Sequence, residues 1–443
     1  MTQKKLDLNQ LREKRGSIEK ELMGKINEVP ELSYKSRTPL FDLNGADVTS
    51  NDIILASLMA KMNVMLIGYQ GKVKTELAKY VRDEWFNGNS AFIRGRKDIT
   101  ASSIFMDLKL KDMKKADTEK NLYNKNEKAN NKLIIIDEFN RTPPIVQQET
   151  FGLSDGHFEK DGEIYYLGVP LNGQEDNRYV AVIGCANIGE TFKGVFEIDK
   201  ALLDRYTILD TDLYPTDPTT YMNYMMHGAD KNIGEANIQD LFVLYKDYYK
   251  YLMREPQTGV LIATISEYLR SGLTYCVKDK TSKSNIEVKL RTGFCDGCHD
   301  KTRGCQHIPL TFERGVEFSN RMFIALDLIT RAKIGMDTID FQAISTGLAK
   351  THAFRLGPIM KVSGLTNRIM INDNTLNPTQ ITNNIAKFIL DDVNSAQDKI
   401  EELLKQGNEI IDGDRSQINS ELVNWFENGR WIHVYKGFMG MIE

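Results

Sequence analysis

The feature that most constrains the fold of this sequence is a glycine-bearing loop between an apolar run and a helical pattern. The run NVMLIG (63–68) predicts a short buried strand, the loop GYQGKVKT (68–75) follows it, and TELAKYVRDEW (75–85) predicts a helix. Strand, glycine loop and helix in this order form the context in which a helix N-terminus binds phosphate. The sequence therefore predicts a phosphate-binding α/β unit.

The loop departs from the usual phosphate-loop pattern at one position. That pattern has a glycine, four residues, a second glycine, and then lysine with serine or threonine. Gly68, Lys74 and Thr75 fit it, whereas Val73 stands where the second glycine belongs. Glycine is needed where φ must be positive or where backbone must approach closely, and valine is larger and β-branched. We therefore expect a loop that still works, with slower turnover or weaker affinity.

Two further apolar runs end in polar residues. KLIIIDEFN (132–140) contains Asp137 and Glu138, and RYVAVIGCAN (178–187) ends at Asn187. Buried parallel strands are continuous apolar runs, and open α/β sheets bind ligands at the carboxyl ends of their strands. The predicted fold class is α/β, with a parallel sheet flanked by helices and a site at that edge.

The remaining segments have weaker patterns. PPIVQQETFGL (143–153) predicts a helix, and HFEKDGEIYYLG (157–168) predicts a β-hairpin around an Asp-Gly turn. The lysine-rich stretch 109–132 has little periodicity and predicts a solvated loop. Apolar residues at helical spacing predict a long amphipathic helix within 381–404, and residues 5–28 predict a charged helix that either caps a domain or forms a solvated arm.

Composition excludes several classes of protein. The chain has 443 residues, 41% of them hydrophobic, which is enough for a large core and two or three domains. Its formal charge of −4 argues against non-specific coating of DNA. Because no apolar run approaches the roughly 20 residues of a membrane span, and the N-terminus continues into charged residues, we expect a cytoplasmic protein without membrane contact.

The cysteines form a second candidate site. Three of the five cysteines lie within CDGCHDKTRGCQH (295–307), which is not the layout of a disulfide scaffold. Cys295 and Cys298 have the spacing of a zinc knuckle, and Cys305 with His307, or alternatively His299, completes four ligands. The alternatives are a Zn²⁺ site and a set of reduced surface thiols.

The polar residues of the first site have separable roles in nucleotide chemistry. Lys74 can reach the β- and γ-phosphate oxygens, while the Thr75 hydroxyl and Asp137 can hold Mg²⁺. Glu138 can orient and deprotonate an attacking water, and Asn187 can hydrogen-bond that water or the γ-phosphate. The alternative for Asp137 and Glu138 is a surface acidic pair at a strand end.

Five segments of the chain resemble the MoxR-type AAA+ ATPases, in the group that includes the midasin and McrB modules. They are RGRKDITASSIFMDL, IIIDEFNRTPPIVQQETF, ALLDRYTILDTDLYP, GVEFSNRMFIALDLITRAKIG and IDFQAISTGLAKTHAFR. The resemblance implies a hexameric ring that binds ATP and Mg²⁺ between subunits and remodels a protein substrate, with an adaptor such as a von Willebrand A domain protein. Together with the patterns along the chain, it predicts four segments: an N-terminal helical arm (1–40), an AAA+ nucleotide-binding domain (41–215), a helical lid with the cysteine-rich insertion (216–360) and a C-terminal helical and aromatic extension (361–443).

The resemblance also assigns individual residues. The phosphate loop is Gly68, Gly71, Lys72, Val73, Lys74 and Thr75; Asp137 and Glu138 are the Walker B pair, Asn187 is sensor 1, Arg205 is the arginine finger and Arg321 is sensor 2. Arg205 has an alternative as a local ion pair with Asp204, and Arg321 as a surface helix residue. An assembly scaffold with little turnover and a nucleic-acid motor, supported only by the lysines of 109–132, remain alternative functions.

Overall fold

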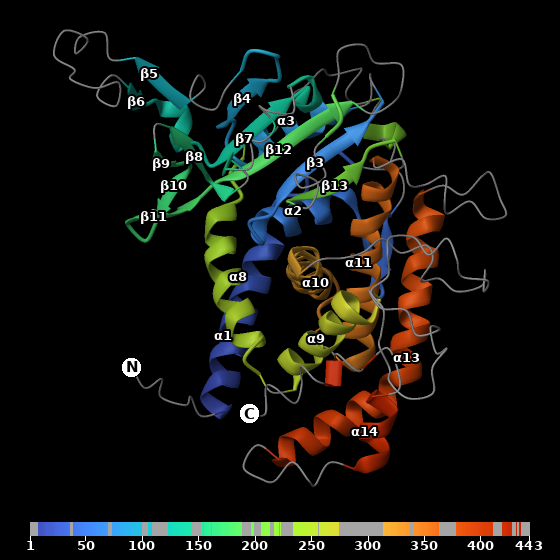
Figure 1. Ribbon diagram of the computed structural model, residues 1–443. Coiled ribbons are helices and arrows are strands. Elements are labelled where there is room, and N and C mark those ends of the chain that lie inside the picture. Colours follow the sequence, from blue (N-terminus) through green and yellow to red (C-terminus); the bar gives the residue numbers. More distant parts are fainter. Residues whose placement is uncertain are drawn as a thin grey trace. The chain divides into compact units, whose positions relative to one another are not determined.

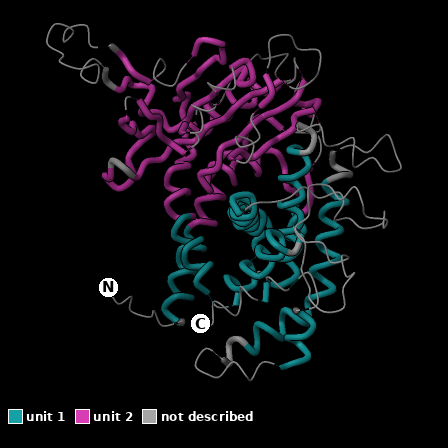
Figure 2. Tube along the Cα trace, in the orientation of Figure 1, with its two compact units in different colours: residues 1–21, 43–46, 246–443 teal, residues 22–42, 47–245 magenta. Residues whose placement is uncertain are grey.

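The structure is a computed structural model. It describes residues 8–35, 39–69, 73–99, 105–108, 123–142, 147, 152–153, 155–160, 162–187, 196–198, 205–212, 217–220, 222, 234–255, 257–273, 313–336, 340–362, 378–410, 419–427, 431 and 434–435. The chain divides into two compact units (Figure 2). Unit 1 comprises residues 1–21, 43–46 and 246–443, and unit 2 comprises residues 22–42 and 47–245.

Unit 2 contains a five-stranded sheet in the order β13-β3-β12-β7-β4 (Figure 1). Its strands are β3 (Asn63–Gly68), β4 (Ala91–Arg94), β7 (Leu133–Asp137), β12 (Ala181–Asn187) and β13 (Tyr206–Asp210). Every neighbouring pair is parallel. The predicted α/β fold class is therefore confirmed, and β4 and β13 are strands that the sequence analysis did not predict.

The register of the sheet brings the polar strand ends to one edge. Asn187 pairs with Gly68, and Arg94 pairs with Asp137. All residues of β3 and β13 are buried, as expected for strands covered on both faces. Helix α2 (Ser50–Met59) contacts β3, and α3 (Lys74–Trp85) contacts β3, β7 and β12. The phosphate loop thus connects β3 to α3 as predicted.

Hairpins extend from unit 2. The predicted hairpin is confirmed as β8 (His157–Lys160) and β9 (Glu163–Tyr166). The others are β1 (Phe41–Leu43) with β2 (Ala46–Val48), β5 (Met106–Leu108) with β6 (Tyr123–Lys125), and β10 (Val169–Leu171) with β11 (Gln174–Tyr179).

The predictions for two segments between the strands are tested only in part. The end of the lysine-rich stretch forms β6 and a 3-10 turn, η2 (Glu127–Asn130), where a solvated loop was predicted. Residues 109–122, and most of the predicted helix 143–153, lie outside the described residues.

Unit 1 is helical. Its elements are α9 (Thr258–Glu267), the π-helical turn η4 (Tyr268–Gly272), α10 (Glu313–Ile334), α11 (Phe341–Val362), α13 (Pro378–Ile410) and α14 (Ser420–Glu427). Helix α11 packs against α10 and α13. Helix α13 confirms the long amphipathic helix predicted near the C-terminus. Trp431 stacks on Tyr268 with 4.3 Å between ring centroids, which anchors the aromatic C-terminal segment.

Helices α1 (Leu8–Glu28) and α8 (Ile238–Leu252) contribute residues to both units. Within unit 1, the buried Arg331 of α10 donates to Asp327 at 2.8 Å and to Glu19 of α1 at 2.7 Å. Asn44 donates to Asp327 and Tyr248 to Glu19. This buried charge network joins the N-terminal helix α1 to α10 within unit 1. None of the helices in the described ranges is long and apolar enough to cross a membrane, and the cytoplasmic location stays a prediction.

Candidate functional site

The phosphate loop begins where β3 ends. Gly68 has φ +155°, and a Cβ at this position would lie 2.5 Å from Thr211 Oγ1, so a larger residue does not fit. Lys74 begins α3 and is 4% exposed. Its Nζ donates to the carbonyl oxygens of Gly68 at 3.1 Å and Tyr69 at 2.7 Å. The lysine is therefore held against the first turn of the loop.

The remaining loop residues are only partly described. Gly71 and Lys72 lie outside the described residues. Val73 precedes α3 with φ −66° and ψ 19°, which is an ordinary conformation for an L-residue. The usual argument for glycine at this position, a positive φ, therefore does not apply to Val73.

Several acidic groups lie near the Lys74 ammonium. Burial lowers the pKa of Lys74, while Cys185, Asp212 and Asp137 act in the opposite direction. Asp212 also accepts the Tyr69 N–H, at 3.1 Å and 3.0 Å to its two carboxylate oxygens. Cys185 is buried, and burial raises the pKa of its thiol.

Thr75 and Asp137 meet across the end of the sheet. The Thr75 hydroxyl donates to Asp137 Oδ1 at 2.8 Å, and the same oxygen accepts the Glu138 N–H at 3.0 Å. One hydroxyl and one carboxylate are hard oxygen donors of the kind that Mg²⁺ prefers. The donor set therefore fits Mg²⁺ together with substrate phosphates. In the described part of the chain, no group of three or more His, Cys, Asp or Glu side chains could hold a metal by itself.

Glu138 differs from Asp137 in its backbone conformation. It has φ +52° and ψ 41° and precedes a 3-10 turn, η3 (Phe139–Arg141). A left-handed conformation at a non-glycine residue is uncommon and occurs preferentially at functional sites. The Glu138 carboxylate accepts from Arg94 Nε at 3.1 Å and lies 3.3 Å from Arg141 Nη2. A Cβ at Gly95 would meet the Glu138 carbonyl oxygen at 2.3 Å, so glycine allows β4 to end this close.

The two arginines and Asn140 were not assigned roles from the sequence. Asn140 Nδ2 donates to the Asn187 carbonyl at 2.5 Å, and its Oδ1 accepts the Asn187 N–H at 3.2 Å. All three lie in segments quoted for the family resemblance: Arg94 ends β4, a strand that the sequence analysis did not predict, and Asn140 and Arg141 lie in η3 just after β7. These positions place them at the same edge as Asp137 and Glu138.

Arg205 lies at the amino-terminal ends of the parallel strands, opposite the ends that carry the candidate site. The next residue, Tyr206, pairs with Asn63 at the amino end of β3, whereas the phosphate loop follows Gly68 at its carboxyl end. Six strand residues separate these ends by about 17 Å. Arg205 Nε is 3.9 Å from Asp155 Oδ2, and the alternative partner Asp204 lies outside the described residues. Arg205 therefore does not join its own chain's phosphate-loop residues.

The remaining predicted residues are Arg321 and the cysteine-rich set. Arg321 lies in α10 of unit 1, where burial and Glu317 raise the pKa of Tyr249 and the Arg321 charge lowers it. Cys295, Cys298, His299, Cys305 and His307 lie outside the described residues.

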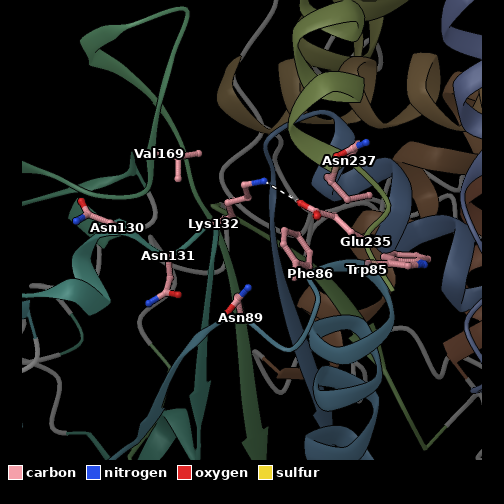
Figure 3. Close-up of a pocket in the computed structure, with 10 residues that line it drawn as sticks. Trp85, Phe86, Asn89, Asn130, Asn131, Lys132, Val169, Glu235 and Asn237 are labelled. Carbon is pink, nitrogen blue, oxygen red and sulfur yellow. Dashed lines mark hydrogen bonds and ion pairs between the residues drawn. The ribbon is translucent and has the colours of Figure 1, made fainter. Parts of the chain in front are cut away.

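A separate small pocket of about 180 Å³ lies at the amino edge of the same sheet (Figure 3). Asn89, Asn131 and Asn237 line it, and Lys132 and Glu235 form an ion pair of 3.2 Å within it. None of the predicted site residues lines this pocket. The candidate site is therefore the carboxyl edge and not this pocket.

Comparisons with known proteins define the class of this domain. Residues 63–206 match the family model of the AAA domain of the dynein-related subfamily. The parallel sheet and this match place the segment among AAA+ ATPase domains, a class of nucleotide-hydrolysing modules.

Two solved structures are similar at low identity. A proposed ATPase from Cytophaga hutchinsonii is 14% identical with a TM-score of 0.44, covering 82% of this chain and 94% of that chain. A full-length MCM homolog from Methanopyrus kandleri is 11% identical with a TM-score of 0.38, covering 77% of this chain and 61% of that chain. No curated protein matches this chain.

Proposed function

We propose that this chain is a MoxR-like AAA+ ATPase that couples ATP binding and hydrolysis to remodelling of a protein partner. The observation that carries the proposal is the meeting of the phosphate loop with two strand ends at one edge: Thr75 bonds Asp137 at 2.8 Å, and Asn187 pairs with Gly68. Random matches to the loop pattern would not bring these residue types together.

Each side chain has a role in this proposal. Lys74 leaves the carbonyls of Gly68 and Tyr69 to bind the β- and γ-phosphates. Thr75 and Asp137 hold Mg²⁺, which neutralises charge on the phosphates when it is bound. Glu138 accepts a proton from the attacking water.

The remaining roles belong to Asn187 within the same chain and to two arginines, of which Arg205 requires a ring of subunits. Asn187 orients the water or the γ-phosphate, Arg205 serves a neighbour's site, and Arg321 acts as sensor 2. The position of Arg205, about 17 Å along the strand from its own phosphate loop, supports action between subunits. A hexameric ring, a protein substrate and a von Willebrand A domain adaptor follow from the same resemblance.

One alternative has a specific observation in its favour. In an assembly scaffold with little turnover, the general base would be restrained, and the Glu138 carboxylate has two arginine partners. The nucleic-acid motor rests on the lysines of 109–132, most of which lie outside the described residues. The zinc site likewise stays a prediction; elemental analysis of untagged protein, with Cys295→Ser as control, tests it.

Phosphate release from ATP separates these functions. The full chain is assayed with Mg²⁺ or with a chelator, and alone, with DNA or with candidate protein partners. We expect Mg²⁺-dependent hydrolysis that Glu138→Gln abolishes and that a protein partner stimulates. Stimulation by DNA alone would favour the motor, and nucleotide binding without hydrolysis under any condition would favour the scaffold.

A further inference from the structure

The side chain of Asn140 closes the end of strand β12. Asn140 lies in η3 and is 4% exposed. Its amide donates to the carbonyl of Asn187 at 2.5 Å and accepts from the N–H of the same residue at 3.2 Å. One side chain therefore holds both polar backbone groups of the residue that ends the strand.

The Asn187 backbone is bonded by a side chain because strand β7 ends before it reaches Asn187. Strand β12 pairs with β7 only as far as Gly184, which lies opposite Ile136. The chain then turns away, because Glu138 adopts the left-handed conformation. The backbone of β7 cannot continue the ladder beside Asn187, and backbone groups left without partners away from water are costly. The Asn140 amide supplies the missing donor and acceptor.

The same contact links two parts of the proposed site. Asn140 is two residues after Glu138, and its own carbonyl accepts the N–H of Phe196 at 2.7 Å, which anchors a third segment. The backbone of Asn187, whose side chain is assigned to the attacking water or the γ-phosphate in the proposed function, is thus held by a residue that follows Glu138.

We propose that Asn140 is a positioning residue for hydrolysis: it fixes the Asn187 amide relative to the Glu138 carboxylate, so that both act on one attacking water. This inference rests on the proposed function. Asn140 itself touches no reacting atom in this account. Its effect on the rate comes entirely from the geometry of Glu138 and Asn187, and small displacements of catalytic groups have large effects on rate.

A conservative variant separates positioning from packing. Asn140→Asp keeps the shape and the acceptor, but it replaces the amide donor with a carboxylate oxygen that faces the Asn187 carbonyl. The ionised carboxylate repels that carbonyl, whereas the protonated acid donates a hydrogen bond to it. Burial and the nearby Asp137 and Glu138 charges should raise the pKa of the new carboxyl above the usual value of about 3.9. The loss of kcat in Asn140→Asp should therefore diminish as pH falls.

Asn63 of β3 provides a matched control, because it contacts the amino end of strand β12. Asn63 is 5% exposed, and its Oδ1 accepts the Val182 N–H at 2.9 Å. Asn63→Ala removes a buried asparagine that bonds the β12 backbone, far from Glu138 and Asn187. It therefore reports the cost of losing such a bond without moving the proposed catalytic groups.

The test measures kcat, KM, ATP dissociation constant and melting temperature for the full-length wild type and the three variants. We expect Asn140→Ala to lower kcat on the order of 10- to 100-fold while ATP affinity stays within about threefold. Asn63→Ala should lower melting temperature without a comparable loss of kcat. The ratio of the Asn140→Asp kcat to the wild-type kcat should rise as pH falls. This ratio tests the positioning role even if Asn140→Ala does not fold.

Four results would overturn the inference. Equal kcat losses in Asn140→Ala and Asn63→Ala, or a pH-independent Asn140→Asp ratio, would leave Asn140 with a packing role alone. A wild-type chain that binds but never hydrolyses ATP would overturn the proposed function and this inference together, whereas wild-type hydrolysis with normal kcat in Asn140→Ala would overturn this inference alone.

Discussion

Arg94 and Glu138 form an ion pair at the carboxyl edge of the sheet, with 3.1 Å between Arg94 Nε and Glu138 Oε2. They lie at the ends of adjacent strands, since Arg94 pairs with Asp137 in the β4–β7 register. The hydrogen bond to Glu138 raises the pKa of Arg94, so the guanidinium remains charged throughout the physiological range. The proposed general base is thus partly engaged by a cation from the neighbouring strand.

We expect Arg94→Ala to raise the basal rate of ATP hydrolysis by about twofold to fivefold, because the freed carboxylate binds water more readily. The modest size reflects the exposure of Arg94, since exposed ion pairs are weak. Arg96→Ala is the matched control: its pair with Asp98 is exposed and lies on the same loop without touching Glu138. A drop in rate in Arg94→Ala but not in Arg96→Ala would mean that Arg94 assists catalysis.

Val73→Gly tests the departure from the usual loop pattern. Because Val73 has an ordinary φ of −66°, glycine relieves no backbone strain, and it is tolerated at a helix N-cap. We expect hydrolysis equal to the wild type or higher, measured as kcat/KM for ATP. A large loss of activity with unchanged melting temperature would show that valine is a required adaptation of the loop.

Unit 1 should lose stability in acid through His352. This imidazole is fully buried, and burial followed by the Arg355 charge lowers its pKa to about 3. Ser319 Oγ donates to the Gly315 carbonyl, so it accepts the His352 Nδ1–H at 2.9 Å, which fixes the neutral ring.

The direction of this pH effect on stability follows from the protonation of His352 in the folded and the unfolded chain. Between pH 6.5 and 3 the unfolded chain binds a proton that the folded chain does not, so the free energy of unfolding falls as pH falls. From pH 7 to 4.5 the loss due to His352 should be about 2–3 kcal/mol, and a His352→Gln variant should lack it. Denaturant unfolding at both pH values measures this difference, and equal losses in the two chains would contradict a neutral buried ring.

Arg205 tests the arrangement between subunits. Arg205→Ala should bind ATP almost normally and hydrolyse it on the order of 10³-fold more slowly, because a neighbour's guanidinium stabilises transition-state charge. Mixing this variant with Glu138→Gln should restore some activity, since mixed rings contain interfaces with both residues intact. Subunit exchange without any recovery, at every mixing ratio, would refute the action of Arg205 on a neighbour.

The sequence predicts those parts of the fold that have strong local signals. Strands β3, β7 and β12 are apolar runs that end in polar residues, and these ends predict the edge where Asp137 and Asn187 lie. Strand β4 is only four residues long, and β13 was matched to a family motif rather than to a strand pattern. Both become evident only when they pair with the central strands.

The contacts within the site could not be predicted from spacing. The bond between Asn140 and Asn187 depends on the left-handed turn at Glu138, and a glutamate gives no sign of such a conformation. The Arg94 pair likewise depends on which strand neighbours β7. Chain order does not determine that neighbour, because β12 lies between β3 and β7 in the sheet.

The central claim is that Lys74 and Glu138 bind and hydrolyse ATP at this edge, and the ATP-induced shift in melting temperature tests it most directly. With Mg²⁺ and ATP at 100 times the dissociation constant, binding stabilises the chain by about 2.7 kcal/mol. We expect the shift in wild type, in the control Lys79→Ala, whose partly exposed lysine on α3 pairs with Glu76, and in Glu138→Gln, which should retain bound ATP. We expect no shift in Lys74→Ala. Equal shifts in Lys74→Ala and wild type would contradict the account.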